Sequence, residues 1–127
     1  MAEENKKTIL VVEDDTFLVR AYKVKFGENG FDVLVASTGE EAMAYLEKDP
    51  VDVVLLDIML PVTSGFDVLK AIRSNAKWGK VPVIVLSNLG QEQDIEKGKA
   101  LGANDYIVKT DVKINDIVGK VMGYLKN

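Results

Sequence analysis

Five short apolar runs, rich in β-branched residues, alternate along this chain with stretches whose apolar residues recur at helical spacing. The runs are residues 8–13, 31–36, 51–56, 81–86 and 105–108, and helices are predicted over 15–29, 38–48, 64–74 and 91–101. A last helix is predicted by one apolar stripe: Ile114, Ile117, Val118, Val121, Met122 and Leu125. The alternation predicts an α/β fold, a single (βα)5 doubly wound, five-stranded parallel sheet.

Local signals support these elements. Thr38 and Glu41 predict a capping box at the start of helix 38–48, and Gly30 and Gly102 predict the ends of helices 15–29 and 91–101. The runs 51–56 and 81–86 are apolar almost throughout, which is typical of central parallel strands that are covered on both faces.

Length and composition restrict the function further. The 127 residues suit one domain. Without cysteine or histidine the chain lacks thiol nucleophiles, zinc-thiolate sites and Ser-His-Asp catalysis. No apolar run is long enough to span a membrane and no secretory signal is visible, so we expect a cytoplasmic protein. A net charge of −4 argues against direct nucleic-acid binding.

Polar side chains follow four of the predicted strands. They are Glu13, Asp14 and Asp15 after the first, Asp57 after the third, Ser87 and Asn88 after the fourth, and Lys109 after the fifth. In a flavodoxin-like sheet of order 2-1-3-4-5 the first and third strands are neighbours at the switch point, so Glu13, Asp14 and Asp57 converge. Clustered carboxylates repel one another unless they are protonated or bind a cation, and oxygen ligands favour Mg²⁺.

Each of these residues also has an ordinary structural explanation. Asp14 or Asp15 could cap the first helix, and Asp57 could belong to a turn. Lys109 could be a solvated surface lysine and Ser87 a loop hydroxyl. Their coincidence at four strand ends of one sheet favours a functional site.

The order of these motifs resembles the receiver domain of two-component response regulators over essentially the whole chain. The resemblance rests on the acidic residues after the first strand, on Asp57 followed by Pro61 and Gly65, on Ser87, and on Tyr106 three residues before Lys109. It implies an N-terminal leader of residues 1–7 and a receiver domain over residues 8–127.

The resemblance implies that Asp57 accepts a phosphoryl group from a phosphohistidine of a partner histidine kinase or histidine phosphotransfer protein. The reaction would be Mg²⁺-dependent, with the metal held by Asp14, Asp57 and the backbone carbonyl of Met59, and by Glu13 through water. The protein would be a phosphoacceptor signalling domain rather than an enzyme that turns over a free substrate.

By the same resemblance, Lys109 pairs with Asp57 at rest and then with a phosphoryl oxygen, and Ser87 hydrogen-bonds another. Ser87 and Tyr106 would form the switch that changes the surface of the fourth helix, fifth strand and fifth helix. That surface would contact a downstream protein target, with no role for a membrane or for direct nucleic-acid binding.

Three departures from the family matter. Thr110 follows Lys109 where the family usually has proline, often with a cis peptide; we expect a trans bond and a differently placed loop. Asn88 stands where a small residue is common, and its amide could crowd or hydrogen-bond the phosphoryl group. Met59 and Leu89 are apolar at positions where polar side chains orient the water in rapidly dephosphorylating relatives, so slow autodephosphorylation is expected.

Other functions fit the sequence less well. A haloacid dehalogenase-like phosphatase would need an acid two residues after Asp57, where Met59 stands, and nucleotide binding would need a glycine-rich loop after the first strand. An unphosphorylated pseudo-receiver that acts as a docking module is a further alternative. We expect a stand-alone receiver, the alternative being an input domain excised from a larger regulator.

Overall fold

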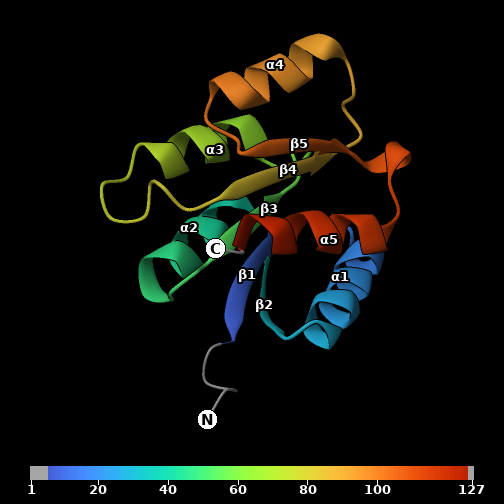
Figure 1. Cartoon of the computed structure of the whole chain (residues 1–127). Coiled ribbons are helices and arrows are strands. Elements are labelled where there is room, and N and C mark those ends of the chain that lie inside the picture. The colour runs from blue at the N-terminus through green and yellow to red at the C-terminus, as the bar shows by residue number, and fades with distance from the viewer. Residues whose placement is uncertain (1–5, 126–127) are drawn as a thin grey trace.

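The sheet has the predicted order. The computed structural model describes residues 6–125, in which five parallel strands are arranged β2-β1-β3-β4-β5 (Figure 1). The strands are β1 (Lys7–Val12), β2 (Phe31–Ala36), β3 (Val53–Leu56), β4 (Val83–Ser87) and β5 (Asp105–Val108). The helices are α1 (Thr16–Glu28), α2 (Gly39–Lys48), α3 (Gly65–Arg73), α4 (Glu92–Ala100) and α5 (Ile114–Leu125).

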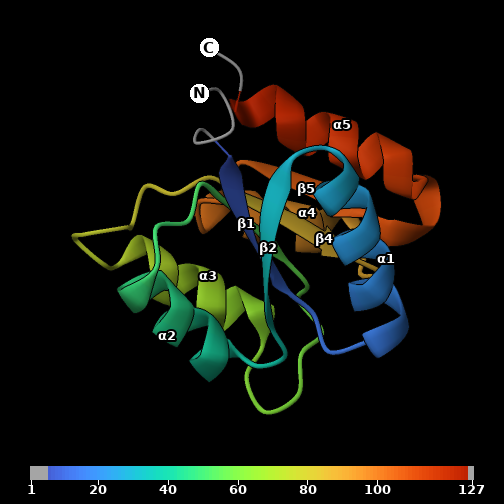
Figure 2. The same cartoon turned by 90° about the horizontal axis from the view of Figure 1, so that it is seen from below.

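Helices cover both faces of the sheet. Helices α1 and α5 lie on one face and α2, α3 and α4 on the other, so that the two views in Figures 1 and 2 show three layers. A separate apolar cluster fills each side, one around Phe26 and Ile117 and the other around Leu69 and Ile72. Every residue of β3 and β4 is buried, which confirms that they are the central strands.

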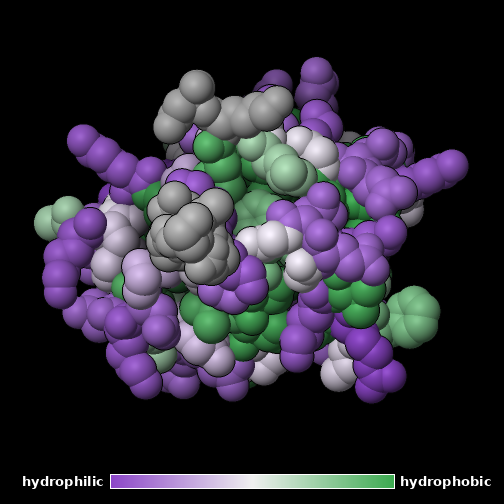
Figure 3. All heavy atoms as spheres, turned by 60° about the horizontal axis from the view of Figure 1, so that its bottom comes forward, coloured by the Kyte–Doolittle hydropathy of each residue, from purple (hydrophilic) through white to green (hydrophobic). Residues whose placement is uncertain are grey.

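Strand β2 forms one edge of the sheet and is covered less completely. Its residues Val33, Leu34 and Val35 are half-buried. From a side that brings the bottom of Figure 1 forward, hydrophobic side chains gather in the middle of the face and hydrophilic ones along its margins (Figure 3). The polar side chains of interest lie elsewhere, at the end of the sheet where the carboxyl ends of β1, β3 and β4 meet.

The helix ends follow the sequence signals with one change. Gly30 (φ 88°) and Gly102 (φ 107°) adopt left-handed conformations after α1 and α4, as their predicted role as helix stops requires. The Thr38 hydroxyl accepts a hydrogen bond from the Glu41 N–H at 3.2 Å. The Glu41 carboxylate, however, accepts from the N–H and the hydroxyl of Ser37, so the return half of the capping box lies one residue earlier than predicted.

Several element boundaries differ from the sequence prediction. Strand β1 begins at Lys7, so this residue does not belong to the leader; residues 1–5 of the expected leader lie outside the described residues. Strands β3 and β4 each begin two residues later than predicted, and Pro82, directly before β4, has no N–H for the sheet. Residues Lys109–Asp111 form a 3₁₀ helix, η2, that the sequence does not predict.

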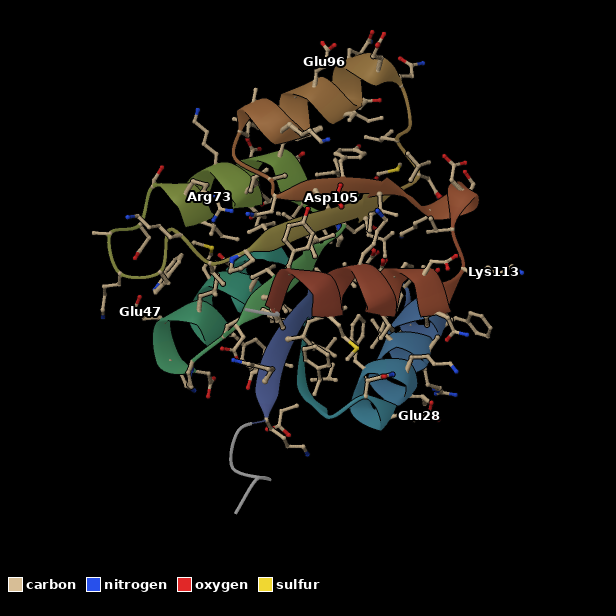
Figure 4. All side chains as sticks on the ribbon, viewed as in Figure 1. Glu28, Glu47, Arg73, Glu96, Asp105 and Lys113 are labelled. Carbon is tan, nitrogen blue, oxygen red and sulfur yellow. The ribbon has the colours of Figure 1, made fainter. Side chains whose placement is uncertain are left out.

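Arg73 connects the segments that precede β4 and β5, at the amino ends of these strands (Figure 4 labels Arg73). Its guanidinium donates hydrogen bonds to the carbonyls of Gly79, Val81 and Gly102 and to the Asn104 side chain, at 2.7–2.9 Å. The end of α3, the loop before β4 and the turn from α4 into β5 are thereby joined by one side chain. Over residues 6–125 no helix has the length and apolar character needed to cross a membrane.

Candidate functional site

The sheet register brings the four polar strand ends to one edge. Val12 at the end of β1 pairs with Leu56 at the end of β3, and the Asp57 N–H donates to the Val12 carbonyl at 3.0 Å. Ser87, the last residue of β4, pairs with Val108 at the end of β5. The residues that follow β1, β3 and β5 therefore emerge side by side with Ser87, as the predicted strand order requires.

Three carboxylates meet at this edge. Glu13, Asp14 and Asp57 each offer an oxygen, and these oxygens lie within 4.8 Å of one another. Glu13 and Asp57 are buried, whereas Asp14 is exposed. Asp15 instead caps α1, because its carboxylate accepts from the N–H groups of Phe17 and Leu18.

Lys109 is the cation that the structure places among these acids. Its Nζ lies 2.9 Å from Glu13 Oε1 and 3.0 Å from Asp57 Oδ2, and its side chain is 14% exposed. Lys109 is thus a largely buried, ion-paired residue rather than a solvated surface lysine. Residues 6–125 contain no cis peptide, so the bond to Thr110 is trans as expected, and Lys109 still reaches Asp57.

Burial and hydrogen bonding shift the pKa values of Glu13 and Lys109. Burial raises the pKa of Glu13 above its usual value, although the hydrogen bond from Lys109 opposes the shift. For Lys109, burial would lower the pKa, but hydrogen bonds to Glu13 and Asp57 outweigh it and the pKa is raised. The ammonium therefore stays charged and neutralises part of the acid cluster at neutral pH.

The loop after β3 holds the Asp57 carboxylate from the other side. The Met59 N–H donates to Asp57 Oδ1 at 3.0 Å, while the Met59 side chain points to solvent and is 57% exposed. Gly65 lies so close that a Cβ added there would be 2.3 Å from the Asp57 carbonyl oxygen. Because Gly65 has no side chain, α3 can begin directly against the Asp57 backbone.

Ser87 and Tyr106 lie on neighbouring strands, at the end of β4 and within β5. Ser87 is fully buried, and its hydroxyl accepts from the Leu89 N–H at 3.3 Å. The Tyr106 ring points inward, 8% exposed, with its hydroxyl donating to the Leu89 carbonyl at 2.7 Å. Gly98 of α4 makes room for the ring, because a Cβ there would lie 2.7 Å from Tyr106 Cδ2. Asn88 points to solvent.

Sequence reasoning missed two features of the site. The direct ion pair between Glu13 and Lys109 was not predicted, since Glu13 was expected to act through a water on the metal. Gly98 was not singled out, although a glycine inside the mostly polar helix α4 was the available signal.

The fold and the site together define a class: a flavodoxin-like α/β domain with a lysine-paired acidic pocket at its topological switch point. The sequence model of the response regulator receiver domain matches residues 9–121. The chain belongs to this family.

Similar proteins agree with this assignment. The transcriptional regulatory protein CpxR of Klebsiella pneumoniae is 45% identical over 101 residues, which are 80% of this chain and 42% of CpxR. The probable transcriptional regulator ycf27 of Cyanophora paradoxa is 37% identical over 84% of this chain and 44% of its own length. This chain thus spans less than half the length of these curated relatives.

Solved structures show the same fold. The receiver domain of the Francisella response regulator 1452 superposes with a TM-score of 0.83 at 33% identity, covering 91% of this chain and 93% of that domain. The phosphorylated cyanobacterial phytochrome response regulator RcpA gives a TM-score of 0.81 at 31% identity, covering 94% and 91%.

Proposed function

We propose that this receiver domain is a phosphoacceptor whose Asp57 takes a phosphoryl group from a phosphohistidine of a partner protein. The observation that carries the proposal is the position of Asp57: buried at the end of β3, paired with Lys109, and within 4.8 Å of the Glu13 and Asp14 carboxylates. A buried carboxylate held by one ammonium and one N–H has the fixed orientation that an in-line attack on phosphorus needs.

In the reaction, an Asp57 oxygen forms a bond to phosphorus while the phosphorus–nitrogen bond to the partner imidazole breaks, and the electron pair leaves with that nitrogen. Charge then develops on the three outer phosphoryl oxygens. Lys109 can transfer its hydrogen bond from Asp57 Oδ2 to one of them, and the Ser87 hydroxyl can donate to another. Glu13 keeps Lys109 at the site during the exchange.

The same cluster suits Mg²⁺, because its side-chain ligands are carboxylate oxygens. Asp14 is exposed, and among residues 6–125 its carboxylate has no protein hydrogen-bond partner, so it is free to bind the ion. Asp57 and the Met59 backbone carbonyl would complete the protein ligands, with Glu13 acting through water. A bound Mg²⁺ would supply positive charge to the phosphoryl oxygens and offset the repulsion among the acids.

The surface around the pocket suits a protein phosphodonor. Val62 is 99% exposed, Phe17 81% and Met59 57%, and they extend from α1 and the loop after β3, the two segments that border Asp57. Val62 also adopts φ 69°, an unfavourable conformation for a β-branched residue. We take the exposed apolar side chains of these two segments as the contact surface for the phosphodonor.

The output switch is proposed at Ser87 and Tyr106. Because Ser87 Oγ and the Tyr106 hydroxyl both bind Leu89, a movement of Ser87 toward a phosphoryl group would be passed to Tyr106 through one residue. Tyr106 packs on Gly98, so α4, β5 and α5 would present the altered surface to a downstream protein. The proposed receiver unit begins with β1, at Lys7 rather than at residue 8, and the cytoplasmic location stays a prediction.

Phosphorylation is tested by incubating the protein with Mg²⁺ and acetyl phosphate, or with beryllofluoride, beside the Asp57→Asn variant. We expect one hydroxylamine-sensitive phosphate per chain in the wild type and none in the variant. A continuous release of phosphate would indicate a phosphatase, and an unmodified wild type would indicate a docking module; either result contradicts the proposal. The reading frame downstream of Asn127 decides between a stand-alone receiver and an input domain.

The protein phosphodonor is tested with Phe17→Ser. This change should slow phosphorylation by the cognate phosphohistidine protein at least tenfold but leave phosphorylation by acetyl phosphate unchanged, because Phe17 is 81% exposed and touches no site carboxylate. Met122→Ser, which alters an exposed apolar residue on α5 without removing a side-chain hydrogen bond, is the matched control. Equal effects of Phe17→Ser with both phosphodonors would rule out a docking role.

A further inference from the structure

A cavity of about 190 Å³ lies behind Lys109, between helices α1 and α5. The two helices run side by side on one face of the sheet, as both Figures 1 and 2 show. The cavity walls are mostly apolar, with Leu18 and Ala21 from α1, Val112 from the segment after η2, and Ile117 from α5. None of Glu13, Asp14 and Asp57 lines the cavity, and Lys109 is the residue that both lines it and pairs with Glu13 and Asp57.

Tyr22 gives the cavity one polar group. Its side chain is only 3% exposed, and no group of residues 6–125 hydrogen-bonds to its hydroxyl, although it lines the cavity. Burial raises the pKa of Tyr22, and the nearby charges of Glu13, Asp57 and Asp15 raise it further. The hydroxyl therefore stays protonated. It is not sealed in the core, because Trp78 Nε1 is the only fully buried side-chain donor without a partner among residues 6–125, so the Tyr22 hydroxyl remains available to an acceptor in the cavity.

The surrounding charges restrict what can bind here. The Lys109 ammonium is already held by Glu13 and Asp57, and further carboxylates lie nearby, so an anion entering the cavity would be repelled. The apolar walls disfavour a cation that would lose its hydration. An uncharged molecule with an apolar body and one accepting oxygen meets both conditions.

A surface groove adjoins the cavity and offers a route into it from solvent. An apolar groove of about 400 Å³ runs over the outer side of α1 between Phe17 and Val24 and shares Ala21 and Ile114 with the cavity. A small molecule can therefore enter over apolar surface without passing the acid cluster.

We propose that the cavity between α1 and α5 binds a small uncharged amphiphile of about the size of cyclohexanol. Its oxygen accepts from the Tyr22 hydroxyl, and its ring packs against Leu18 and Ile117. Because Lys109 and Val112 belong to the cavity wall, an occupant restrains the segment that carries the ammonium. Occupancy thus slows the transfer of Lys109 from Asp57 to a phosphoryl oxygen, a consequence that rests on the proposed function.

Binding is tested with cyclohexanol and benzene as probes, followed through backbone amide chemical shifts of the full chain without Mg²⁺. Both probes should shift amides of residues 18–22 and 112–117. Tyr22→Phe should weaken cyclohexanol binding about fivefold, the value of one hydrogen bond, and leave benzene binding unchanged. Ala21→Leu fills the shared wall and should weaken both at least tenfold, whereas the matched Ala44→Leu on α2 should weaken neither.

Shifts confined to other residues, or a Tyr22→Phe variant with unaltered preference between the two probes, would overturn the site. The regulatory consequence has its own readout: saturating cyclohexanol should slow phosphorylation by acetyl phosphate in the wild type but not in Ala21→Leu. An unchanged wild-type rate would refute that consequence. A protein that takes no phosphate at all would refute the proposed function, while the binding data would still decide the site.

Discussion

Gly65 shows how one missing side chain positions the phosphoacceptor. Its N–H donates to the Ile58 carbonyl at 2.8 Å, and an added Cβ would lie 2.5 Å from Ile58 Cα. Because the atoms in the way belong to the backbone, they cannot move aside as the end of a flexible side chain can. We expect Gly65→Ala to lower the free energy of unfolding by about 1–3 kcal/mol, the usual cost of overpacking, measured by urea denaturation.

A matched glycine separates the contact from helix propensity. Gly119 lies in α5, and a Cβ added there would have no heavy atom within 4 Å, so Gly119→Ala should raise stability by about 0.5–1 kcal/mol. If both substitutions stabilise the protein, the close approach of Gly65 to Asp57 does not limit which residue position 65 can hold, and the explanation is wrong.

Met59 and Leu89 are predicted to set the lifetime of a phosphorylated Asp57, a prediction that rests on the proposed function. Neither side chain can hydrogen-bond to a water that attacks phosphorus. The lifetime should therefore be minutes or longer, and Met59→Asn should shorten it about tenfold by orienting that water. Loss of bound phosphate over time measures both; a wild-type lifetime of seconds would contradict the explanation.

At this scale the sequence predicted which side chains converge but not all of the pairings among them. Asp57 and Ser87 lie at the same end of the sheet because strand order alone brings strand ends together. The pairing of Glu13 with Lys109 depends on how far two long side chains reach in a buried space, which strand order does not determine. The inward position of Tyr106 depends on the room above Gly98, a packing property.

Arg73 holds one end of helix α4, an element with few other anchors. Only Gly98 of α4 is buried, and Gln91 at its start makes no side-chain cap. Arg73→Met would leave the carbonyls of Val81 and Gly102 without their charged donor. Because hydrogen bonds to charged groups are worth about 1.5–3 kcal/mol, we expect a loss of about 2–4 kcal/mol in urea denaturation.

Arg20→Met tests whether losing any arginine has this effect. Arg20 is exposed on α1, so its replacement should change the stability by less than about 0.5 kcal/mol. Native-state hydrogen exchange should also show α4 opening more readily in Arg73→Met than in wild type. Equal exchange in α4 would mean that Arg73 stabilises only the loop before β4.

The elements with strong periodicity were the ones the sequence predicted well. Strands β2 and β5 have the predicted bounds, since each apolar run is bordered by polar or turn residues. The 3₁₀ helix Lys109–Asp111 carries no apolar period, and its conformation follows from the connection it must make between β5 and α5. Arg73 gave no signal either, because an arginine in the last turn of a helix is usually solvated.

Across the whole molecule, charge is distributed unevenly. Residues 1–64 contain 13 acidic and 6 basic residues, and residues 65–127 contain 7 and 10. The fold brings Lys109 from the basic half to Glu13 and Asp57 of the acidic half. This pairing offsets one charge of a cluster of three carboxylates, so the unliganded protein retains electrostatic strain at this edge of the sheet.

That strain predicts a pH dependence of stability in the absence of Mg²⁺. The pKa of Glu13 is raised in the folded protein. Below about pH 4.5 the residue is protonated in the folded and the unfolded state, and it does not lower the free energy of unfolding. As the pH rises from there through the raised pKa, the unfolded chain releases the proton first, and the free energy of unfolding falls. Lys109 adds no slope in this range, because its raised pKa acts only at alkaline pH.

Glu13→Gln isolates this contribution, since glutamine cannot ionise and can still accept a hydrogen bond from Lys109. The stability of the variant minus that of the wild type should grow from about pH 4.5 upward and then level off, by about 1.4 kcal/mol for each unit by which the native pKa is raised. Urea denaturation with a chelator present gives the two curves. Adding Mg²⁺ should shrink the difference, because the cation favours the ionised cluster; parallel curves without Mg²⁺ would show that Lys109 fully offsets the burial of Glu13.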